Sequence, residues 1–388
     1  MLDYVKNKRI CSIVFGGTDL PTIAYKDVGM FLYKLATNYN WKSTYVYYQS
    51  IYSEDMWNDN FKSHVEMHCL GKEANYKKQI ALAKDFIKEH IKDYDVIMFF
   101  NYGSTIWKLA RLCKQVNPNI VVYSKLDMSN GGFSHFCSDK SFMGIRNYAE
   151  KIKSRYVDVF SVETKSYFEA LSNTSVFKNR LGHIPNGVSM LDVNIEKIDA
   201  IPKENMVITI GRLGDYQKNN ELLLEALELL PEELVKLWKF VFIGPATAEF
   251  IKKIEVFKLN YPNKADSIIM TGNIMDRQTV YEYCKKARII CMTSRYESTC
   301  LATLEGMFFG AYPVITNYSE FTRDTTDDGL YGSVVDLGNV EALVNTLKLV
   351  MRDKDIDKKC MMCQDYSRRM FGYDELTEKL NKLLAEYL

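Results

Sequence analysis

The feature that most constrains the fold is a repeated alternation of short apolar runs with amphipathic stretches. In the first half the runs are rich in Val, Ile, Tyr and Phe, as strands covered on both faces require. They occupy residues 10–15, 44–48, 94–100, 119–124 and 157–162. The stretch 77–92 has apolar residues at helical spacing, with Lys and Glu on its other side. This pattern predicts a parallel sheet covered by helices.

The second half repeats the alternation and predicts a second domain of the same class. Its expected strands are 206–210, 239–243, 267–271, 288–292, 312–316 and 332–336. Its expected helices include 220–230, 277–286 and 340–351, and a last amphipathic helix covers 373–388. Regularity breaks near 184–201, where Pro and Gly interrupt the pattern. We therefore expect an α/β protein with two doubly wound domains.

Composition favours a globular chain that does not span a membrane. Of its 388 residues, 47% are hydrophobic, yet no apolar run reaches the roughly 20 residues that cross a bilayer. The first residues resemble a strand more than a signal peptide. Nine cysteines lie at irregular spacings, and the pair Cys360 and Cys363 has neither a second pair nor a His nearby. We expect no metal site, reduced thiols and a cytoplasmic location.

Charge is distributed unevenly along the chain. Residues 1–190 carry 25 Lys and Arg against 18 Asp and Glu, whereas residues 191–388 carry 25 against 31. A basic half indicates an anionic partner or a solvated surface, and the net charge of +1 gives no support to a nucleic-acid partner. Within this half, 133–156 interleaves cations with Phe, Met and Tyr. Such a segment contacts an anionic membrane peripherally or packs as a helix with a basic face.

Two carboxylates in the second half are candidates for hydroxyl recognition. Glu297 follows the expected strand 288–292, and Glu305 lies about two turns along a helix expected to begin near Ser298. A carboxylate accepts hydrogen bonds from adjacent hydroxyls, and the start of a helix attracts phosphate. The alternative is a capping residue plus a surface Glu.

The loop after the strand 206–210 carries a glycine and two cations. Gly211 permits close backbone approach, and Arg212 and Lys218 can grip a diphosphate from two sides. Taken alone, the two cations could equally be solvated.

Together these residues resemble the retaining glycosyltransferases of family 4, which have the GT-B fold. The resemblance rests on HIPNGV at 183–188, ITIGRL to LEAL at 208–227, FIG at 242–244, TGNI at 271–274, SRYEST to LEG at 294–306 and PVIT to SE at 313–320. It implies two Rossmann-like domains facing across a cleft. Residues 1–190 would be the acceptor side and 191–372 the donor domain, with the helix 373–388 packed back on the first domain.

The resemblance implies a role for each matching residue. Arg212 and Lys218 would bind the donor diphosphate, Glu297 the hydroxyls of the transferred sugar, and Glu305 the ribose. Further donor contacts are implied for Gly16, Gly17, Gly211, Asn273, Ile274, Ser298, Thr299, Cys300 and Leu301. The alternative for Gly16 and Gly17, which follow the first strand, is a plain tight turn.

The first half departs from the family near the reacting centre. Where many members have a His, this chain offers Lys125 and Asp127. Asp127 is our candidate for the catalytic polar group, with a helix cap or turn residue as the alternative. His135 and His183 are alternatives for the same role, although a structural role is the interpretation that we favour for each.

The sequence thus predicts sugar transfer from a nucleotide-sugar, with UDP favoured, to an acceptor hydroxyl with retention of configuration. The acceptor would be a saccharide, a lipid-linked saccharide or a protein. Neither a cofactor nor a metal ion is expected. The alternatives are a non-catalytic relative that binds sugar nucleotides or assists a partner, and another GT-B enzyme such as an epimerase or phosphorylase.

Overall fold

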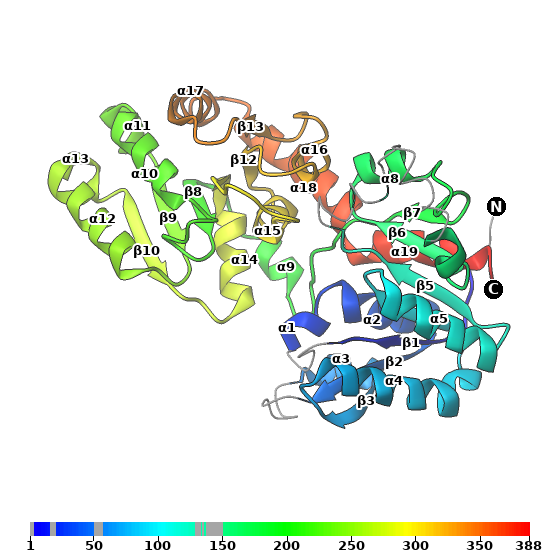
Figure 1. Cartoon of the computed structure of the whole chain (residues 1–388). Helices are drawn as coiled ribbons and strands as arrows, with labels where there is room; N and C mark the ends of the chain where they lie inside the picture. The colour runs from blue at the N-terminus through cyan, green and yellow to red at the C-terminus, as the bar shows by residue number, and fades with distance from the viewer. Residues whose placement is uncertain (1–3, 16–20, 50–56, 129–132, 134–135, 137–149) are drawn as a thin grey trace. The chain divides into compact units, whose positions relative to one another are not determined.

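The computed structural model describes residues 4–15, 21–49, 57–128, 133, 136 and 150–388. Its contacts divide the chain into two units, one of Met1–Leu191 with Gly372–Leu388 and one of Asp192–Phe371 (Figure 1). The last helix, drawn in red, therefore belongs to the first unit although the second unit precedes it in sequence.

In the described part of the first unit, seven parallel strands form one sheet in the order β3-β2-β1-β4-β5-β6-β7. Their bounds are β1 (Arg9–Ile13), β2 (Lys42–Gln49), β3 (Val65–Lys72), β4 (Val96–Phe100), β5 (Val121–Lys125), β6 (Val159–Val162) and β7 (Leu181–His183). Successive side chains of a strand point to opposite faces. Accordingly Ile97 and Phe99 join one apolar cluster, whereas Val96 and Met98 join another.

Helices cover both faces of this sheet. The described helices of the unit are α1 (Pro21–Ala24), α2 (Asp27–Tyr39), α3 (Asp59–His64), α4 (Tyr76–His90), the 3-10 turn η2 (Ile91–Asp93), α5 (Ser104–Val116), α8 (Lys165–Leu171) and α19 (Tyr373–Ala385). Residues of α4, α5 and α8 complete one cluster, and those of α2, α3 and α19 complete the other. The Phe31 and Tyr373 rings meet edge to face with centroids 5.5 Å apart, which joins α2 to α19.

All residues of the second unit are described, and six parallel strands form its sheet in the order β10-β9-β8-β11-β12-β13. Their bounds are β8 (Glu204–Ile210), β9 (Lys239–Ile243), β10 (Ile268–Gly272), β11 (Ala287–Met292), β12 (Tyr312–Thr316) and β13 (Ser333–Val335). Its helices are α9 (Ile195–Asp199), α10 (Asn220–Leu229), α11 (Glu232–Val235), α12 (Ala248–Asn260), α13 (Pro262–Ala265), α14 (Arg277–Lys286), α15 (Leu301–Phe308), α16 (Phe321–Thr326), α17 (Val340–Met351) and α18 (Ile356–Phe371). Helices α10, α12 and α17 cover one face, while α14, α15 and α18 contact strands from the other.

The expected α/β class is confirmed, and most elements lie where the sequence predicts them. Strands 239–243 and 312–316 and helices 277–286 and 340–351 match to the residue. The sequence did not predict β3, β7 or α18. Strand β3 lies at an edge of the sheet and is half-exposed, so its residues are not the apolar run expected of a covered strand.

Candidate functional site

In the second unit the strand order reverses between the neighbours β8 and β11. Open α/β sheets bind ligands beyond the carboxyl ends of their strands at such a switch point. Two loops leave the sheet there, 211–219 after β8 and 293–300 after β11. Both loops carry residues that the sequence analysis singled out.

Gly211 opens the first loop against Gly244, which follows β9. The Gly211 N–H donates to the Ile243 carbonyl oxygen at 2.9 Å. Both glycines have positive φ, 153° and 134°, and a Cβ on Gly244 would lie 2.0 Å from the Gly211 carbonyl oxygen. Because only glycine fits this approach, the pair fixes where the loop leaves the sheet.

An ion pair between Lys218 and Glu297 joins the two loops. Lys218 Nζ donates to Glu297 Oε1 at 2.5 Å, and Ser294 Oγ donates to the same oxygen at 2.9 Å. Glu297 Oε2 accepts from Gln217 Nε2 at 3.1 Å. The side chains of the ion pair are only 15% and 9% exposed. Three donors thus orient one carboxylate in a largely buried setting, where pairing is stronger than at the surface.

Arg212 enters the same network through Gln217. One Arg212 guanidinium nitrogen donates to Gln217 Oε1 at 3.0 Å, and Nε donates to Asp215 Oδ2 at 3.1 Å. The hydrogen bond to Asp215 raises the pKa of Arg212, whose side chain is 60% exposed. The structure therefore brings together the three residues Arg212, Lys218 and Glu297, linked by Gln217. We call these four residues the loop network.

Glu305 lies on α15 and pairs with Arg277, the first residue of α14. The Arg277 guanidinium also donates to the Tyr281 hydroxyl, at 3.1 Å from Nε. Burial opposes the Arg277 charge, but Glu305 and Tyr281 outweigh it and raise the pKa of Arg277. Sequence reasoning missed Arg277, because nothing in the motif TGNI links it to a carboxylate 28 residues later.

The helix that carries Glu305 begins at Leu301 rather than near Ser298. Its N-cap is Cys300, whose side chain makes no capping hydrogen bond. Thr299 accepts from the Leu301 N–H at 2.9 Å through its backbone carbonyl. The sequence placed the start three residues early because Ser and Thr are the usual N-caps. The N–H groups of the first turn are thus those from Leu301 onward.

Asn273 and Ile274 follow β10 in a short exposed turn. The Asn273 side-chain amide lies 3.1 Å from Met275 Sδ. Asp276 caps the next helix by accepting from the backbone N–H groups of its first turn. This segment therefore places Arg277 at the first position of α14.

In the first unit, the exposed Asp127 follows β5 and lines a cavity of about 440 Å³. The other lining residues include the ends of β1 and β4, between which the strand order of this sheet reverses. Asp127 therefore lies where sheets of this kind bind ligands.

Lys125, the other polar residue of this stretch, is buried. Its Nζ lies 3.3 Å from Asp27 Oδ2 and donates to Asn186 Oδ1 at 3.0 Å. The Tyr373 hydroxyl donates to Asp27 Oδ1 at 2.5 Å, and the Gly187 N–H donates to the same oxygen at 3.2 Å. Lys125 thus fixes the chain segment after β7 and the start of α19, which is a structural role.

His183 and Glu163 lie next to this cluster. His183 Nε2 is 3.2 Å from the Glu163 carbonyl oxygen, and burial lowers the pKa of His183 to about 4. Burial raises the pKa of Glu163 to about 7, opposed by Lys125 and reinforced by Asp127. A half-buried histidine that stays neutral near pH 7 is better suited to packing than to proton transfer.

Comparison with known proteins identifies the second unit. Residues 192–370 match the family described as glycosyl transferases group 1. This unit is a group 1 glycosyltransferase domain. Membership of family 4 in particular stays a prediction.

Two curated relatives of this chain are bacterial transferases. One, from Campylobacter jejuni, is a GalNAc-α-(1→4)-GalNAc-α-(1→3)-diNAcBac-PP-undecaprenol α-1,4-N-acetyl-D-galactosaminyltransferase, 26% identical over 62% of this chain and 64% of its own length. The other is the serotype-specific mannosyltransferase WbdA of Escherichia coli, 21% identical over 66% of this chain and 32% of its own length. This chain thus spans less than two thirds of the length of either relative.

A solved structure extends the similarity to both units. Anabaena HepE in complex with UDP has a TM-score of 0.66 at 13% identity, covering 98% of this chain and 100% of HepE. The GT-B fold class expected from the sequence is thereby confirmed.

Outside the group 1 domain, some predicted residues cannot be placed. Gly16, Gly17 and His135 lie outside the described residues, as does most of 133–156. Three aromatics of that segment are described, and two of them, Phe133 and Phe136, pack internally. Phe136 is 2% exposed, and the Phe133 ring stacks on Tyr167 with centroids 4.2 Å apart. Phe133 and Phe136 therefore agree with the alternative in which this segment packs against the domain rather than on a membrane.

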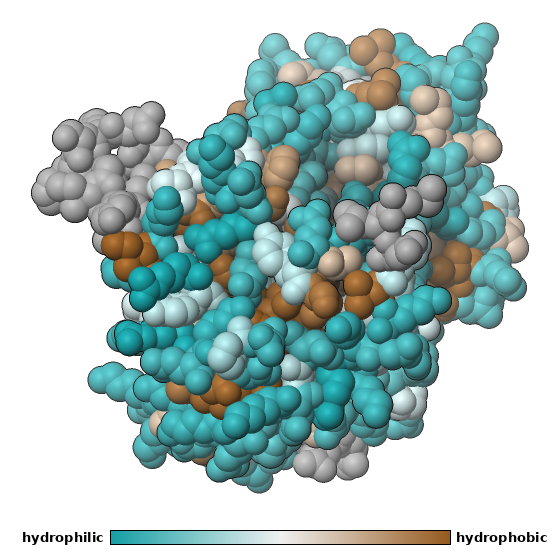
Figure 2. Space-filling view, turned by 90° about the vertical axis from the view of Figure 1, so that its right-hand side faces the viewer, coloured by the Kyte–Doolittle hydropathy of each residue, from teal (hydrophilic) through white to brown (hydrophobic). Residues whose placement is uncertain are grey.

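The described surface gives no further support to membrane contact. On the face shown in Figure 2, apolar side chains of the described residues form separate patches within a hydrophilic surface. Among the residues described, no helix has both the length and the apolarity to cross a bilayer.

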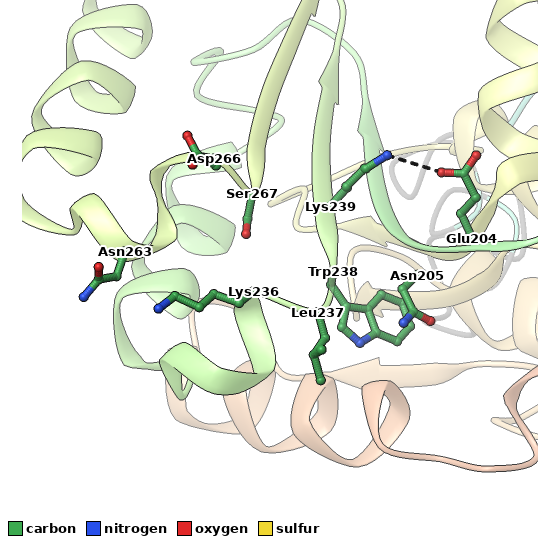
Figure 3. Close-up of a pocket in the computed structure, with 9 residues that line it drawn as sticks. All are labelled: Glu204, Asn205, Lys236, Leu237, Trp238, Lys239, Asn263, Asp266 and Ser267. Carbon is green, nitrogen blue, oxygen red and sulfur yellow. Dashed lines mark ion pairs between the residues drawn. The ribbon is translucent and has the colours of Figure 1, made fainter.

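Two other features of the group 1 domain lie away from the loop network. A surface cavity of about 510 Å³ is lined by Glu204, Trp238 and Lys239 at the amino ends of the strands (Figure 3), opposite the carboxyl ends that carry the loop network. Cys360 and Cys363 lie on α18, where their thiols donate to backbone carbonyls at 3.3 and 3.6 Å. These cysteines therefore serve packing.

Proposed function

We propose that this protein is a retaining glycosyltransferase that moves a sugar from a nucleotide-sugar, UDP-sugar favoured, to an acceptor hydroxyl during cell-surface polysaccharide, glycolipid or glycoprotein synthesis. The observation that carries the proposal is the loop network at the switch point of a group 1 domain. The transferase activities of the two bacterial relatives and the UDP bound to HepE support this proposal.

Each part of the donor has a suitable partner in this proposal. Arg212 and Lys218 neutralise the diphosphate, and Glu297 accepts hydrogen bonds from the hydroxyls of the transferred sugar. Glu305, with Arg277 beside it, holds the ribose hydroxyls. The amino end of α15 contributes its dipole to the binding of the phosphates, because the start of a helix attracts anions.

The reaction breaks the bond between the anomeric carbon and the diphosphate oxygen and forms one to the acceptor oxygen on the same face. The acceptor proton passes to the leaving diphosphate, so that the products are a glycoside and a nucleoside diphosphate. The oxocarbenium-like transition state needs chiefly a stabilised leaving group and a placed acceptor. Arg212 and Lys218 supply that stabilisation, and we propose that no metal ion is required.

Asp127 remains our candidate for the polar group on the acceptor side. It is exposed, lines a cavity at the carboxyl ends of the strands and is free to accept a hydrogen bond from an acceptor hydroxyl. We place the protein in the cytoplasm, with a peripheral membrane contact if its acceptor is lipid-linked.

A thermal-shift screen of the purified protein against UDP, GDP and ADP, with and without EDTA, tests the proposal. A ligand that binds only the native state raises the melting temperature, by an amount that grows with its concentration over Kd. We expect one nucleotide, UDP, to raise it equally with and without EDTA. If no nucleotide has an effect, with or without added Mg²⁺, the transferase proposal fails and a non-catalytic role replaces it.

A further inference from the structure

Gln217 is the residue at which the two loops of the site meet. Its side-chain Nε2 donates to Glu297 Oε2 at 3.1 Å and to the Tyr296 carbonyl oxygen at 3.0 Å. Its Oε1 accepts from the Arg212 guanidinium at 3.0 Å. Both hydrogens of the amide and its oxygen are therefore used. One side chain thus connects the cation that we assign to the diphosphate with the carboxylate that we assign to the sugar.

The backbone of Gln217 is held by the same two loops. Its N–H donates to Asp215 Oδ1 at 2.9 Å, and its carbonyl oxygen accepts from the Arg295 N–H at 2.8 Å. The Arg295 guanidinium also donates to the Tyr216 carbonyl oxygen at 2.6 Å. A side chain whose own backbone is fixed on both sides is suited to position another group, because little of its freedom remains to be lost.

The partners of the Gln217 amide allow only one orientation of it. A guanidinium group only donates hydrogen bonds, and an ionised carboxylate only accepts them. The amide oxygen must therefore face Arg212, and the amide nitrogen must face Glu297. An amide turned the other way would place oxygen against oxygen and nitrogen against nitrogen, and both hydrogen bonds would be lost. The orientation of the Glu297 carboxylate is thus coupled to the position of Arg212.

The two oxygens of Glu297 have different partners. Oε1 accepts from Lys218 Nζ at 2.5 Å and from Ser294 Oγ at 2.9 Å. Among the described residues, Oε2 accepts from Gln217. A carboxylate oxygen has two lone pairs, so Oε2 has room for one further hydrogen bond. Oε2, beside the Gln217 amide, is therefore the oxygen that can accept from a sugar hydroxyl while Lys218 stays in place.

We propose that Gln217 is a positioning residue for the donor sugar. Through Nε2 it orients Glu297 toward the hydroxyls of the transferred sugar, and through Oε1 it makes that orientation depend on Arg212 at the diphosphate. The sugar is thus recognised best when the diphosphate is in place. This inference rests on the proposed transferase function, and it gives Gln217 no contact of its own with the substrate.

Calorimetric titration of UDP and of a UDP-sugar into the full chain measures this role separately from folding. The probes are UDP-glucose, UDP-galactose, UDP-N-acetylglucosamine and UDP-N-acetylgalactosamine, and the conjugate that the wild type binds most tightly is used for every variant. The Kd of UDP divided by the Kd of that conjugate reports the contribution of the sugar. A merely structural loss would weaken both ligands equally and leave this ratio unchanged.

Gln217→Met removes the amide and keeps the length of the side chain. We expect the Kd ratio to fall about tenfold, the usual effect of losing one hydrogen bond to a charged group. The affinity for UDP alone should change by less than about threefold, since Arg212 keeps its contact with Asp215.

Gln217→Glu supplies a rescue that depends on pH. A protonated carboxyl group has one O–H to donate to Glu297 and a carbonyl oxygen to accept from Arg212, as the amide does. The Kd ratio, relative to the wild type at the same pH, should therefore approach one at about pH 4.5. As the pH rises to about 8, the new group becomes a second carboxylate beside Glu297, and the relative ratio should fall about tenfold.

Gln364→Glu is the matched control. Gln364 Nε2 donates to Asp199 Oδ1 at 3.2 Å, and the Arg368 guanidinium donates to the same oxygen at 2.8 Å. This is the same combination of amide, carboxylate and cation, but it joins α18 to α9 and lies outside the loop network. The Kd ratio of this variant should equal that of the wild type at every pH.

A wild-type ratio in Gln217→Met would overturn the inference, and so would a ratio in Gln217→Glu that does not change with pH. If UDP binds to the wild type but none of the conjugates does, the inference fails while the nucleotide site stands. If UDP does not bind, the transferase proposal fails and the role of Gln217 fails with it.

Discussion

At the scale of single residues, the Lys218–Glu297 pair joins the two loops of the site that we propose for the donor. The two residues that we assign to the diphosphate and to the sugar satisfy each other at 2.5 Å. A donor must therefore replace this contact, taking Lys218 to its phosphates and leaving Glu297 for sugar hydroxyls. The carboxylate then competes with a nucleoside diphosphate for the same cation.

This competition leads to a prediction for Glu297→Gln. Transfer should fall at least about a hundredfold, because a preorganised partner of the reacting sugar is lost. Affinity for UDP alone should rise about two- to fivefold, since removing a competing charge contact is worth up to about 1 kcal/mol. Calorimetric titration and a transfer assay measure the two effects.

Glu232→Gln is the matched control for that variant. Glu232 pairs with Lys236 at 2.6 Å on the surface of the same domain, away from the network. Its UDP affinity and transfer rate should equal those of the wild type. Weaker UDP binding by Glu297→Gln would show that Lys218 and Glu297 do not compete as we infer.

Sequence reasoning found individual site residues when a local motif surrounded them. Arg212, Lys218 and Glu297 each follow a strand within a recognisable motif, and the structure joins them in one network. Gln217 and Arg277 were missed because their importance comes from partners far along the chain. Hydrogen bonds between distant segments depend on the fold and leave no local pattern.

At the scale of elements, the ends of β8 and β9 set the position of the network. Gly211 and Gly244 approach so closely that the loop after β8 leaves the sheet at one defined point. From there the loop runs to Lys218 and on to α10. The geometry of the site thus depends on two backbone positions that carry no side chain.

Gly244→Ala should therefore destabilise the domain by about 2 kcal/mol or more and weaken UDP binding, because the added Cβ meets the Gly211 carbonyl oxygen. Gly338→Ala is the control, since Gly338 also has positive φ, at 70°, but has nothing within 4 Å of an added Cβ. That variant should lose about 1 kcal/mol, from backbone strain alone. Urea unfolding followed by tryptophan fluorescence measures both, and equal losses would contradict the clash.

An element was easier to predict from the sequence when more of its side chains are buried. Nearly all residues of strands β9 and β12 are buried, and the apolar runs in the sequence predicted the first and last residue of each strand correctly. Strand β7 has three half-buried residues, too few to form a pattern. Helix α18 is amphipathic but rich in charge, and its buried Cys360 and Cys363 drew attention to metal spacing rather than to helical periodicity.

At the scale of the whole molecule, the two units share one architecture, and we propose a different ligand for each. Each has a parallel sheet whose strand order reverses once at its centre, and in each the candidate residues follow the strands at that point. The alternation of strands and helices was enough to predict both sheets from sequence. The assignment of the donor to one unit and of the acceptor to the other rests only on the family resemblance, because periodicity carries no information about ligands.

The central claim is that the loop network is the donor site, and calorimetric titration of UDP into Arg212→Ala tests it most directly. The control is Arg323→Ala, since Arg323 is 63% exposed and pairs with Asp328 at 2.7 Å, much as Arg212 is 60% exposed and pairs with Asp215. We predict that Arg212→Ala weakens UDP binding at least tenfold, the effect of losing a charge-assisted contact of about 1.4 kcal/mol or more. Arg323→Ala should bind as the wild type does. Wild-type affinity in Arg212→Ala, or equal losses in both variants, would contradict the account.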